Sequence, residues 1–170
     1  MAISGSLRIG SSNHAILRYL GTLITVDFEY TIYDQMAFIP PFDPGNDNES
    51  VADAVVDFRN LIKGADGIII CTPEYAFGVP GQFKNALDWT VSSGSFSCKP
   101  TALITASTGG QNAHEALIKI LGAIDAQLIP IATLLISYIR SKLGTDGEIT
   151  DVETKQSLDT LLDAFLTAIK

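Results

Sequence analysis

The sequence predicts an α/β protein: a doubly wound, three-layer sandwich with a five-stranded parallel sheet of order 2-1-3-4-5 and helices on both faces. Strand-like apolar segments alternate with segments of helical periodicity along the whole chain. The segment Ile68 to Cys71 is entirely apolar, which is typical of a parallel strand buried on both faces. No linker or repeat divides the 170 residues, so we expect one domain over residues 1–170.

In the N-terminal half, strands are expected at Ala2 to Ser4 and within Val26 to Asp34, where β-branched and aromatic residues are frequent. A helix is expected between them, over Ser12 to Leu23. Residues Met36 to Glu49 are rich in Pro, Gly, Asn and Asp, which predicts a loop. The next helix follows a capping-box spacing that opens with Ser50.

The remaining segments continue the alternation. A short helix with Pro80 in its first turn follows the third strand, and the last helix follows a second capping-box spacing that opens with Thr150. The expected elements are a helix over Pro80 to Trp89, a strand over Thr101 to Ala106, a helix over Gln111 to Ile124, a strand within Gln127 to Ile136 and a helix over Asp151 to Lys170. In such a sheet ligands bind beyond the carboxyl ends of the strands.

The composition disfavours several classes of function. The formal net charge is −8, which argues against nucleic acid and anionic membranes as partners. The longest apolar stretches are well short of the roughly 20 residues of a membrane span. The start of the chain has no feature of a secretory signal, so a cytoplasmic location is expected. The cysteines have no metal-ligand or redox spacing, and Cys71 is expected to be buried.

Small and hydroxylated residues follow the first strand, from Gly5 to Asn13, and lead directly into a helix. Main-chain N–H groups at a helix N-terminus lack partners and carry partial positive charge, which suits a phosphate. Ser6, Ser11 and Asn13 offer further donors, and Arg8 offers a charge. The alternative is that Ser11 or the serine after it only caps the helix, while the glycines make the turn. The segment lacks the glycine patterns of dinucleotide and P-loop sites.

Proline, glycine and aromatic residues follow the third strand. The segment Thr72 to Gly81 contains Pro73, Glu74, Tyr75, Ala76 and Phe77. A rigid backbone with two aromatic side chains suits a flat heteroaromatic ring, which needs an apolar face and main-chain polar groups along its edge. The alternative is an ordinary rigid turn whose aromatic side chains pack locally.

A third small-residue loop, made of Ser107, Thr108, Gly109 and Gly110, follows the fourth strand and leads into a helix. Alone it indicates little. In a sheet of order 2-1-3-4-5, however, the carboxyl ends of strands one, three and four are neighbours, so the three loops are expected to form one site.

Other candidate residues carry less weight. His14 and His114 lie near helix starts with no acid or nucleophile at a recognisable spacing, which favours surface or capping roles over catalysis. Asp88 and Trp89 end a helix and are expected to pack either on the core or on a partner subunit. No GxSxG elbow is present, which disfavours a hydrolase.

Taken in order, these loops resemble the NAD(P)H-dependent FMN reductase family of flavodoxin-like proteins, which includes bacterial quinone, chromate and azo-dye reductases. The stretch Gly5-Ser6-Leu7-Arg8, with Ser11 and Asn13, is similar to the phosphate loop of the family. The second motif of the family is similar to Pro73-Glu74-Tyr75, followed by Pro80-Gly81 and Lys84-Asn85-Ala86-Leu87-Asp88-Trp89. The resemblance extends over nearly the whole chain.

The resemblance implies a flavodoxin-like fold, FMN as cofactor and NADPH or NADH as electron donor. Hydride would pass to flavin N5, and electrons would then pass to a small acceptor such as a quinone, free flavin, an azo compound or a metal ion. Because the chemistry belongs to the cofactor, no catalytic side chain and no resident metal are expected.

The resemblance also assigns the site residues and the assembly. The implied cofactor-binding residues are Ser6, Arg8, Ser11 and Asn13 at the phosphate, Pro73, Glu74, Tyr75, Ala76 and Phe77 along the ring, and Ser107, Thr108, Gly109 and Gly110 on its far side. The family implies a homodimer or homotetramer with the flavin near the interface, and the segment Tyr75 to Trp89 would serve both cofactor and partner.

The sequence departs from the family pattern in three places. Ala76 stands where the family usually has Asn, which removes one side-chain contact and makes the pocket over the ring more apolar. The loop Ser107 to Gly110 is shorter than usual, and only Met1 to Ser4 are present for the first strand. Two other functions remain open: a flavodoxin-type electron carrier that meets only protein partners, and a relative that has lost FMN and is structural or regulatory.

Overall fold

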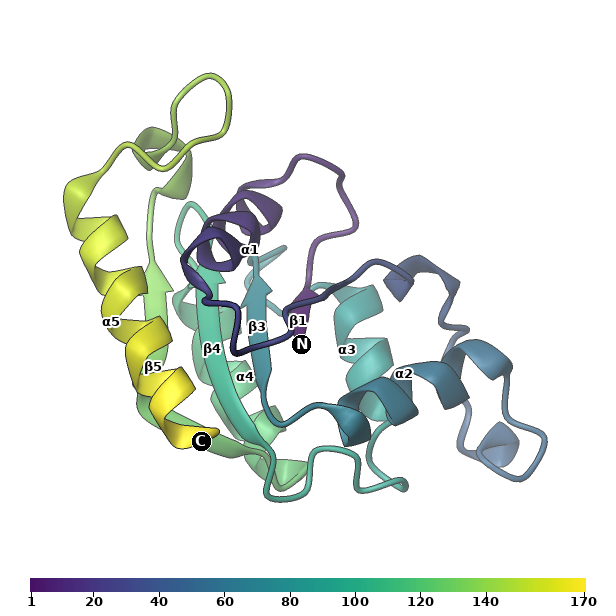
Figure 1. The fold of residues 1–170 in the computed structure, drawn as a ribbon. Coiled ribbons are helices and arrows are strands. Elements are labelled where there is room, and N and C mark those ends of the chain that lie inside the picture. Colours follow the sequence, from purple (N-terminus) through teal and green to yellow (C-terminus); the bar gives the residue numbers. More distant parts are fainter.

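The computed structural model describes all 170 residues and contains one five-stranded sheet in the order β2-β1-β3-β4-β5 (Figure 1). The strands are β1 (Ala2–Ser4), β2 (Ile32–Tyr33), β3 (Ile68–Thr72), β4 (Pro100–Ala106) and β5 (Gln127–Ile136). All four pairings are parallel. The predicted fold class and strand order are therefore confirmed.

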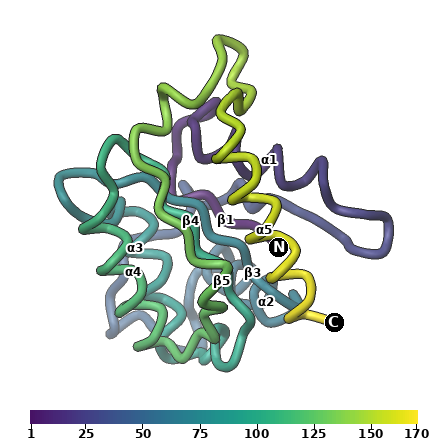
Figure 2. Tube along the Cα trace, turned by 90° about the vertical axis from the view of Figure 1, so that its left-hand side faces the viewer, coloured from purple at the N-terminus to yellow at the C-terminus, as the bar shows by residue number.

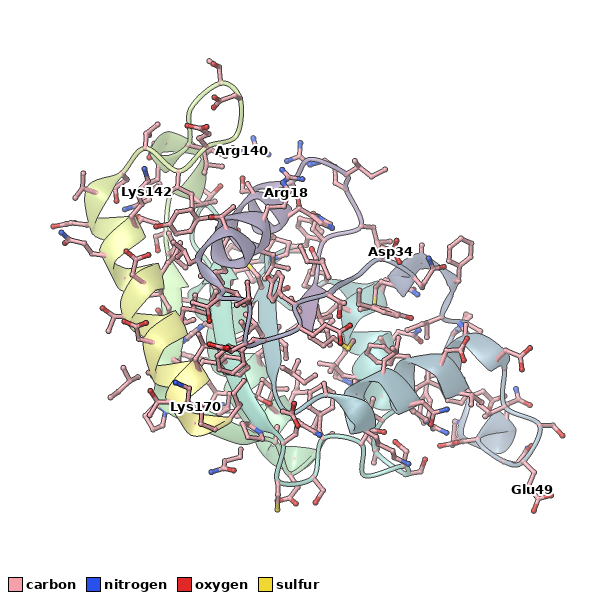
Figure 3. All side chains as sticks on the ribbon, viewed as in Figure 1. Arg18, Asp34, Glu49, Arg140, Lys142 and Lys170 are labelled. Carbon is pink, nitrogen blue, oxygen red and sulfur yellow. The ribbon has the colours of Figure 1, made fainter.

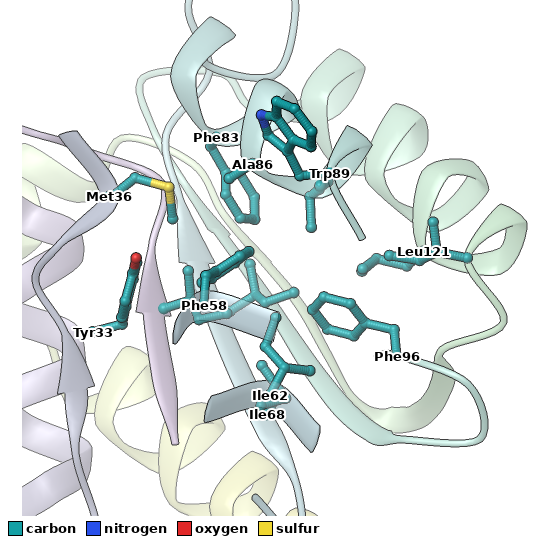
Figure 4. Close-up of a cluster of buried hydrophobic side chains, with 14 of the residues drawn as sticks. Tyr33, Met36, Phe58, Ile62, Ile68, Phe83, Ala86, Trp89, Phe96 and Leu121 are labelled. Carbon is teal, nitrogen blue, oxygen red and sulfur yellow. The ribbon is translucent and has the colours of Figure 1, made fainter. Parts of the chain in front are cut away.

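Five helices cover the two faces of the sheet, which lies between the helix layers in Figure 2. They are α1 (Ser12–Leu23), α2 (Asp53–Gly64), α3 (Gly81–Asp88), α4 (Gln111–Ala123) and α5 (Val152–Ala168). One buried cluster joins α2, α3 and α4 to the sheet, and a second joins α1 and α5 to its other face. The first cluster, shown in Figure 4, brings together the fully buried rings of Phe58, Phe83 and Phe96.

Strand β3 explains why the sequence around it is continuously apolar. Ile68 and Ile70 belong to the cluster under α2, α3 and α4, whereas Ile69 and Cys71 belong to the cluster under α1 and α5. Successive side chains of a strand point to opposite faces, and here both faces are covered. Cys71 is fully buried, as expected, and burial raises the pKa of its thiol.

The second strand is much shorter than the segment Val26 to Asp34 that the sequence predicts. Only Ile32 and Tyr33 pair with β1, opposite Ala2 and Ile3. Because β1 itself has three residues, the segment before Ile32 has no strand beside it, and Val26 is fully exposed. High β-propensity without a pairing partner does not make a strand.

The two predicted capping boxes are also corrected by the structure. Helix α2 begins after Ala52, which makes no side-chain cap, so Ser50 does not cap it. At α5 the cap is Asp151 rather than Thr150, because the Asp151 carboxylate accepts the Thr154 N–H at 2.8 Å. The same carboxylate also pairs with Lys142 at 3.3 Å.

None of the helices combines the length and hydropathy that a bilayer span requires.

Helix α3 holds the long loop that follows β2. The Asn85 amide accepts the Phe42 N–H at 2.6 Å and donates to the Pro40 carbonyl at 2.9 Å. The Trp89 indole N–H donates to the same carbonyl at 2.8 Å, and its ring meets Phe42 edge-on. Trp89 is 2% exposed, so of the two expectations for this residue the structure supports packing on the core.

Candidate functional site

Three loops meet at the carboxyl ends of the central strands: the β1 loop (Gly5–Ser11), the β3 loop (Pro73–Pro80) and the β4 loop (Ser107–Gly110). The Asn13 amide in the first turn of α1 links the ends of β3 and β4 to the start of this helix. It donates to the Ala106 carbonyl at 3.4 Å and accepts from the Cys71 thiol at 3.3 Å. A side chain on Gly5 would lie 2.1 Å from the Thr72 hydroxyl, so β1 and β3 approach closely here.

The β1 loop leaves a group of main-chain donors without acceptors. Gly5, Ser6, Arg8 and Ser11 donate their N–H groups to protein atoms. The N–H groups without an acceptor in the protein belong to Leu7, Ile9, Gly10, Ser12 and Asn13. Several of these lie at the N-terminus of α1, where the helix dipole adds partial positive charge. This end of α1 is therefore open to an anion.

The four predicted phosphate residues occupy different environments around that helix end. Ser6, Ser11 and Asn13 are each 3% exposed. The Ser11 hydroxyl caps α1 by accepting the His14 N–H at 3.2 Å, and the Ser6 hydroxyl accepts the Arg8 N–H at 3.3 Å. The Arg8 side chain is exposed and forms no ion pair. Figure 3 shows Arg18 on α1 and Arg140 after β5 at the same upper end of the molecule.

The β3 loop contains a tight turn with a strained backbone. Tyr75 and Gly78 exchange both main-chain hydrogen bonds, at 3.0 and 2.9 Å. The two residues between them, Ala76 and Phe77, have φ angles of 49° and 60°, as in a type I′ turn. Residues with a Cβ adopt this region at a cost of roughly 1–2 kcal/mol each, and Asn tolerates it better than Ala or Phe. The turn leaves the side chains of Tyr75 and Phe77 55% and 82% exposed.

Glu74 joins the β3 loop to the start of α4. Its carboxylate accepts the Gly110 N–H at 3.3 Å and the Ala113 N–H at 2.9 Å. The Ser107 hydroxyl donates to the Glu74 carbonyl at 3.4 Å. Helix α4 has no side-chain cap of its own, because Gly110 is its N-cap residue. Glu74 therefore supplies the missing cap from another loop and fills this helix end with negative charge.

The β4 loop is tightly packed. Gly110 has a φ of 103°, and a side chain there would lie 2.8 Å from Leu135. The carbonyls of Ser107 and Thr108 accept the N–H groups of Ile139 and Tyr138 at 3.1 Å. The four predicted residues of this loop are thus held by both the β3 loop and the segment that follows β5.

A histidine stands in the first turn of each of α1 and α4. Nδ1 of His14 lies 3.0 Å from the Ser11 hydroxyl, and Nδ1 of His114 lies 2.9 Å from the Thr105 hydroxyl. Burial lowers the pKa of both imidazoles below the ordinary value of 6.5. Both side chains are consequently mostly neutral near pH 7.

A large cavity lies away from these loops. It has a volume of about 800 Å³ and opens at the edge of the sheet beside β2, between α2 and α5. Its lining includes four acidic side chains, from Asp27, Glu29, Asp57 and Asp66, and none of the predicted site residues. An acidic lining does not suit a phosphate, so we place the candidate site at the three loops.

Comparison with known proteins decides the family. A family model described as NADPH-dependent FMN reductase matches residues 1–140. The chain belongs to this family. FMN is therefore its cofactor and NAD(P)H its electron donor, as the sequence predicts.

Individual relatives and structures agree with this assignment. The quinone reductase of Escherichia coli K12 is 32% identical over 172 residues, which cover 97% of this chain and 92% of the relative. The NADPH azoreductase of Bacillus sp. OY1-2 is 31% identical over 153 residues, covering 87% and 83%. The structure of FerB, a flavoenzyme NAD(P)H:(acceptor) oxidoreductase from Paracoccus denitrificans, has a TM-score of 0.85 at 26% identity and covers 99% of this chain and 94% of its own. These relatives are reductases, which favours the enzyme over the electron carrier.

Two contacts in the site were not predicted from the sequence. The capping of α4 by Glu74 depends on a contact between residues 36 and 39 positions apart, which no local pattern reveals. The contact of the His14 ring with the Ser11 hydroxyl spans only three residues. Ser11 is the N-cap residue and His14 is the third residue of the helix. A side chain at the third position can reach the N-cap side chain, so this local spacing predicts the pair.

Proposed function

We propose that the protein is an FMN-dependent NAD(P)H:quinone reductase whose cofactor is held by the three loops at the carboxyl edge of the sheet. The observation that carries the placement is the open N-terminus of α1, with free N–H groups on Gly10, Ser12 and Asn13. Quinones are proposed as acceptors because the relatives named for their substrates include quinone reductases. Azo compounds, free flavin and metal ions are further acceptors of the same class.

The residues of the β1 loop fit the phosphate of FMN. The free N–H groups supply hydrogen bonds, and the unpaired Arg8 guanidinium supplies charge. The buried hydroxyls of Ser6 and Ser11 stand beside these donors. Asn13 would act through its N–H, because its side chain amide is engaged with Cys71 and Ala106.

The β3 and β4 loops fit the flavin ring. Pro73 and the turn from Tyr75 to Gly78 would form one rigid border, with Tyr75, Ala76 and Phe77 presenting apolar surface. Glu74 would hold this border against the loop Ser107 to Gly110, which would close the far side through Thr108 and Gly109. When bound, FMN supplies the redox chemistry by accepting hydride and passing electrons on. The chain itself positions the cofactor and keeps one side open to the small substrates.

We further propose that a second copy of the chain completes the pocket. Large apolar side chains stand exposed on the loops: Leu7 is 51% exposed, Ile9 is 96% exposed and Phe77 is 82% exposed. Apolar groups gathered at one end of a protein indicate an interface. A homodimer, alone or within a homotetramer, would cover them and the flavin together. Trp89 takes no part in this surface because it is buried in the core.

The test is an absorbance spectrum of the purified protein with added FMN, followed by anaerobic NADPH or NADH and then a soluble quinone. We expect bound flavin that bleaches with the nucleotide and regains its colour with the quinone. Bound flavin that no nucleotide bleaches would favour an electron carrier, and a failure to bind FMN would contradict the proposed site.

A variant tests the phosphate end of the proposed site. Arg8→Ala removes a charge that has no structural partner, so the fold should be unaffected. FMN affinity should fall about tenfold, since a charged hydrogen bond contributes about 1.5–3 kcal/mol. Riboflavin, which lacks the phosphate, should bind both proteins equally. Unchanged FMN affinity would remove Arg8 from the site.

A further inference from the structure

The imidazole of His14 is placed between the two hydroxyl groups that frame the start of α1. Its Nδ1 lies 3.0 Å from the Ser11 hydroxyl and 3.4 Å from the Ser4 hydroxyl. Its own main-chain N–H is the group that Ser11 caps. The ring therefore touches the same serine that stands beside the free N–H groups at this helix end, although His14 itself is no part of the phosphate-loop motif.

The surroundings of the ring keep it neutral in the absence of an anion. Burial lowers the pKa of His14, and the Arg18 guanidinium, one helical turn further along α1, lowers it further. A hydrogen bond to the Arg8 carbonyl acts in the opposite direction and favours the protonated ring. His14 forms no ion pair with any carboxylate. The site thus lacks a negative partner for a protonated imidazole.

The protonation state of His14 controls the hydrogen on Ser11. When Nδ1 is unprotonated it accepts the Ser11 hydroxyl hydrogen, so the serine offers only oxygen lone pairs to its surroundings. When Nδ1 carries a hydrogen it donates to the serine oxygen, which already accepts the His14 N–H. Both lone pairs are then engaged and the hydroxyl hydrogen is free to reach an acceptor. An anion at the helix end favours this second arrangement, because it attracts both the charge and the free hydrogen.

We propose that His14 is a positioning residue for the FMN phosphate, which takes up a proton as the phosphate binds and turns the Ser11 hydroxyl toward it. The inference rests on the proposed function, and it deepens that function by coupling cofactor binding to pH. His114 is the control. The Glu74 carboxylate already accepts two N–H groups at the start of its helix, so the protonation of His114 should not depend on FMN.

The protein contains only two histidines, so proton NMR of the two imidazoles follows each one separately in the wild-type protein. We expect FMN to raise the pKa of His14 by about one and riboflavin to leave it unchanged, since only FMN brings the phosphate. The pKa of His114 should not respond to the phosphate. The variant His14→Gln assigns the two resonances.

Affinity provides an independent readout. Between about pH 8 and about pH 6, FMN binding to the wild type should strengthen a few-fold more than binding to His14→Gln, and this gain approaches about tenfold only well below the pKa of the unliganded His14. The phosphate of FMN also titrates near pH 6, but this contribution is the same for both proteins. His114→Gln should keep the wild-type pH profile. His14→Arg, which carries a charge at every pH, should keep the preference for FMN over riboflavin and retain only the pH dependence that the phosphate itself brings.

The outcomes separate the two proposals. If FMN binds and the His14 pKa is the same with FMN and with riboflavin, the role of His14 is overturned while the flavin site stands. If the wild type binds no FMN, both proposals fall. A pKa of His14 that rises with FMN alone, together with a pH dependence that is weaker in His14→Gln and unchanged in His114→Gln, supports the coupling.

Discussion

Helices α1 and α4 start in the same way, yet their N-termini are used differently. Each follows a loop of small residues at the carboxyl end of a strand, and each carries a histidine beside a hydroxyl group. At α1 the N–H groups of Gly10, Ser12 and Asn13 are free. At α4 the Glu74 carboxylate accepts the N–H groups of Gly110 and Ala113. A side chain from a neighbouring loop thus decides which helix end can take an anion.

The β1 and β4 loops look alike in sequence, but they differ in which of their main-chain N–H groups have acceptors. The β1 loop keeps its donors for a ligand. At α4 the Glu74 carboxylate accepts the N–H groups of Gly110 and Ala113, fixes the β3 turn there and places negative charge beside the free N–H groups of Gln111 and Asn112. A negatively charged Glu74 would also oppose an anion at α4. In the proposed function, the N-terminus of α1 binds the cofactor and the N-terminus of α4 holds the loops around it.

The largest effect is expected for Gly110→Ala. The residue has a φ of 103° and its new methyl group would lie 2.8 Å from Leu135, so both backbone strain and overpacking should destabilise the fold. Chemical denaturation should show a loss of about 2–4 kcal/mol. Gly10→Ala is the control, because Gly10 also has a positive φ but nothing within 4 Å. It should lose only about 1–2 kcal/mol, and equal losses would mean that the two loops are equally packed.

Glu74→Ala should make the end of α4 resemble the end of α1. Two N–H groups lose their acceptor, so unfolding should be easier by about 1–2 kcal/mol. Added sulfate should stabilise this variant more than the wild type, because the vacated helix end can now take an anion. Glu115→Ala is the matched control, since that carboxylate contacts only the Gln111 side chain. A variant that sulfate stabilises no more than the wild type would contradict the proposed difference.

Ser11→Ala tests the open helix end. Loss of the N-cap should cost about 1 kcal/mol of stability. It should also weaken FMN binding several-fold without affecting riboflavin, which fluorescence titration measures. Ser12→Ala is the control, because the Ser12 side chain makes no hydrogen bond within the protein. The structure places the cap on Ser11, so similar losses for the two variants would contradict the assignment.

The smallest effect concerns the pH dependence of stability without cofactor. The folded pKa of each histidine lies below its unfolded value of 6.5, so the unfolded chain binds protons first as the pH falls. Thermal stability should therefore be complete above about pH 7 and decrease on acidification through 6.5 toward the folded pKa values. Replacing either histidine with Gln should make this decrease shallower. With FMN bound, only His114→Gln should do so, and equal effects of the two variants in the holoprotein would contradict the contrast.

Much of the fold was predictable because its signals are local. The apolar run Ile68 to Cys71 gave a buried strand and the periodic segments gave the helices, with bounds within one or two residues for α1 and α4. The predicted strand within Val26 to Asp34 was too long because pairing depends on a partner elsewhere in the chain. Ser50 was wrong as a cap because the helix starts later than the spacing suggests.

The site was predictable as a set of loops but not as a set of contacts. Residue types at three strand ends were enough to place the loops together, because the sheet order makes those ends neighbours. The inward-facing Asn13 amide, the Glu74 cap and the left-handed Ala76 and Phe77 depend on the packed structure. These contacts and conformations depend on which polar groups lack a partner in the folded protein, and local sequence patterns do not reveal this.

The most direct test of the account compares main-chain amide resonances of the protein saturated with FMN and with riboflavin. The two ligands share the ring, so the shift differences report the phosphate alone. We predict that the differences concentrate on Leu7, Ile9, Gly10, Ser12 and Asn13 and that the amides of Gly110 and Ala113 are unaffected. Differences centred on Gly110 and Ala113 would mean that the phosphate binds at α4 and that the open end of α1 has another purpose.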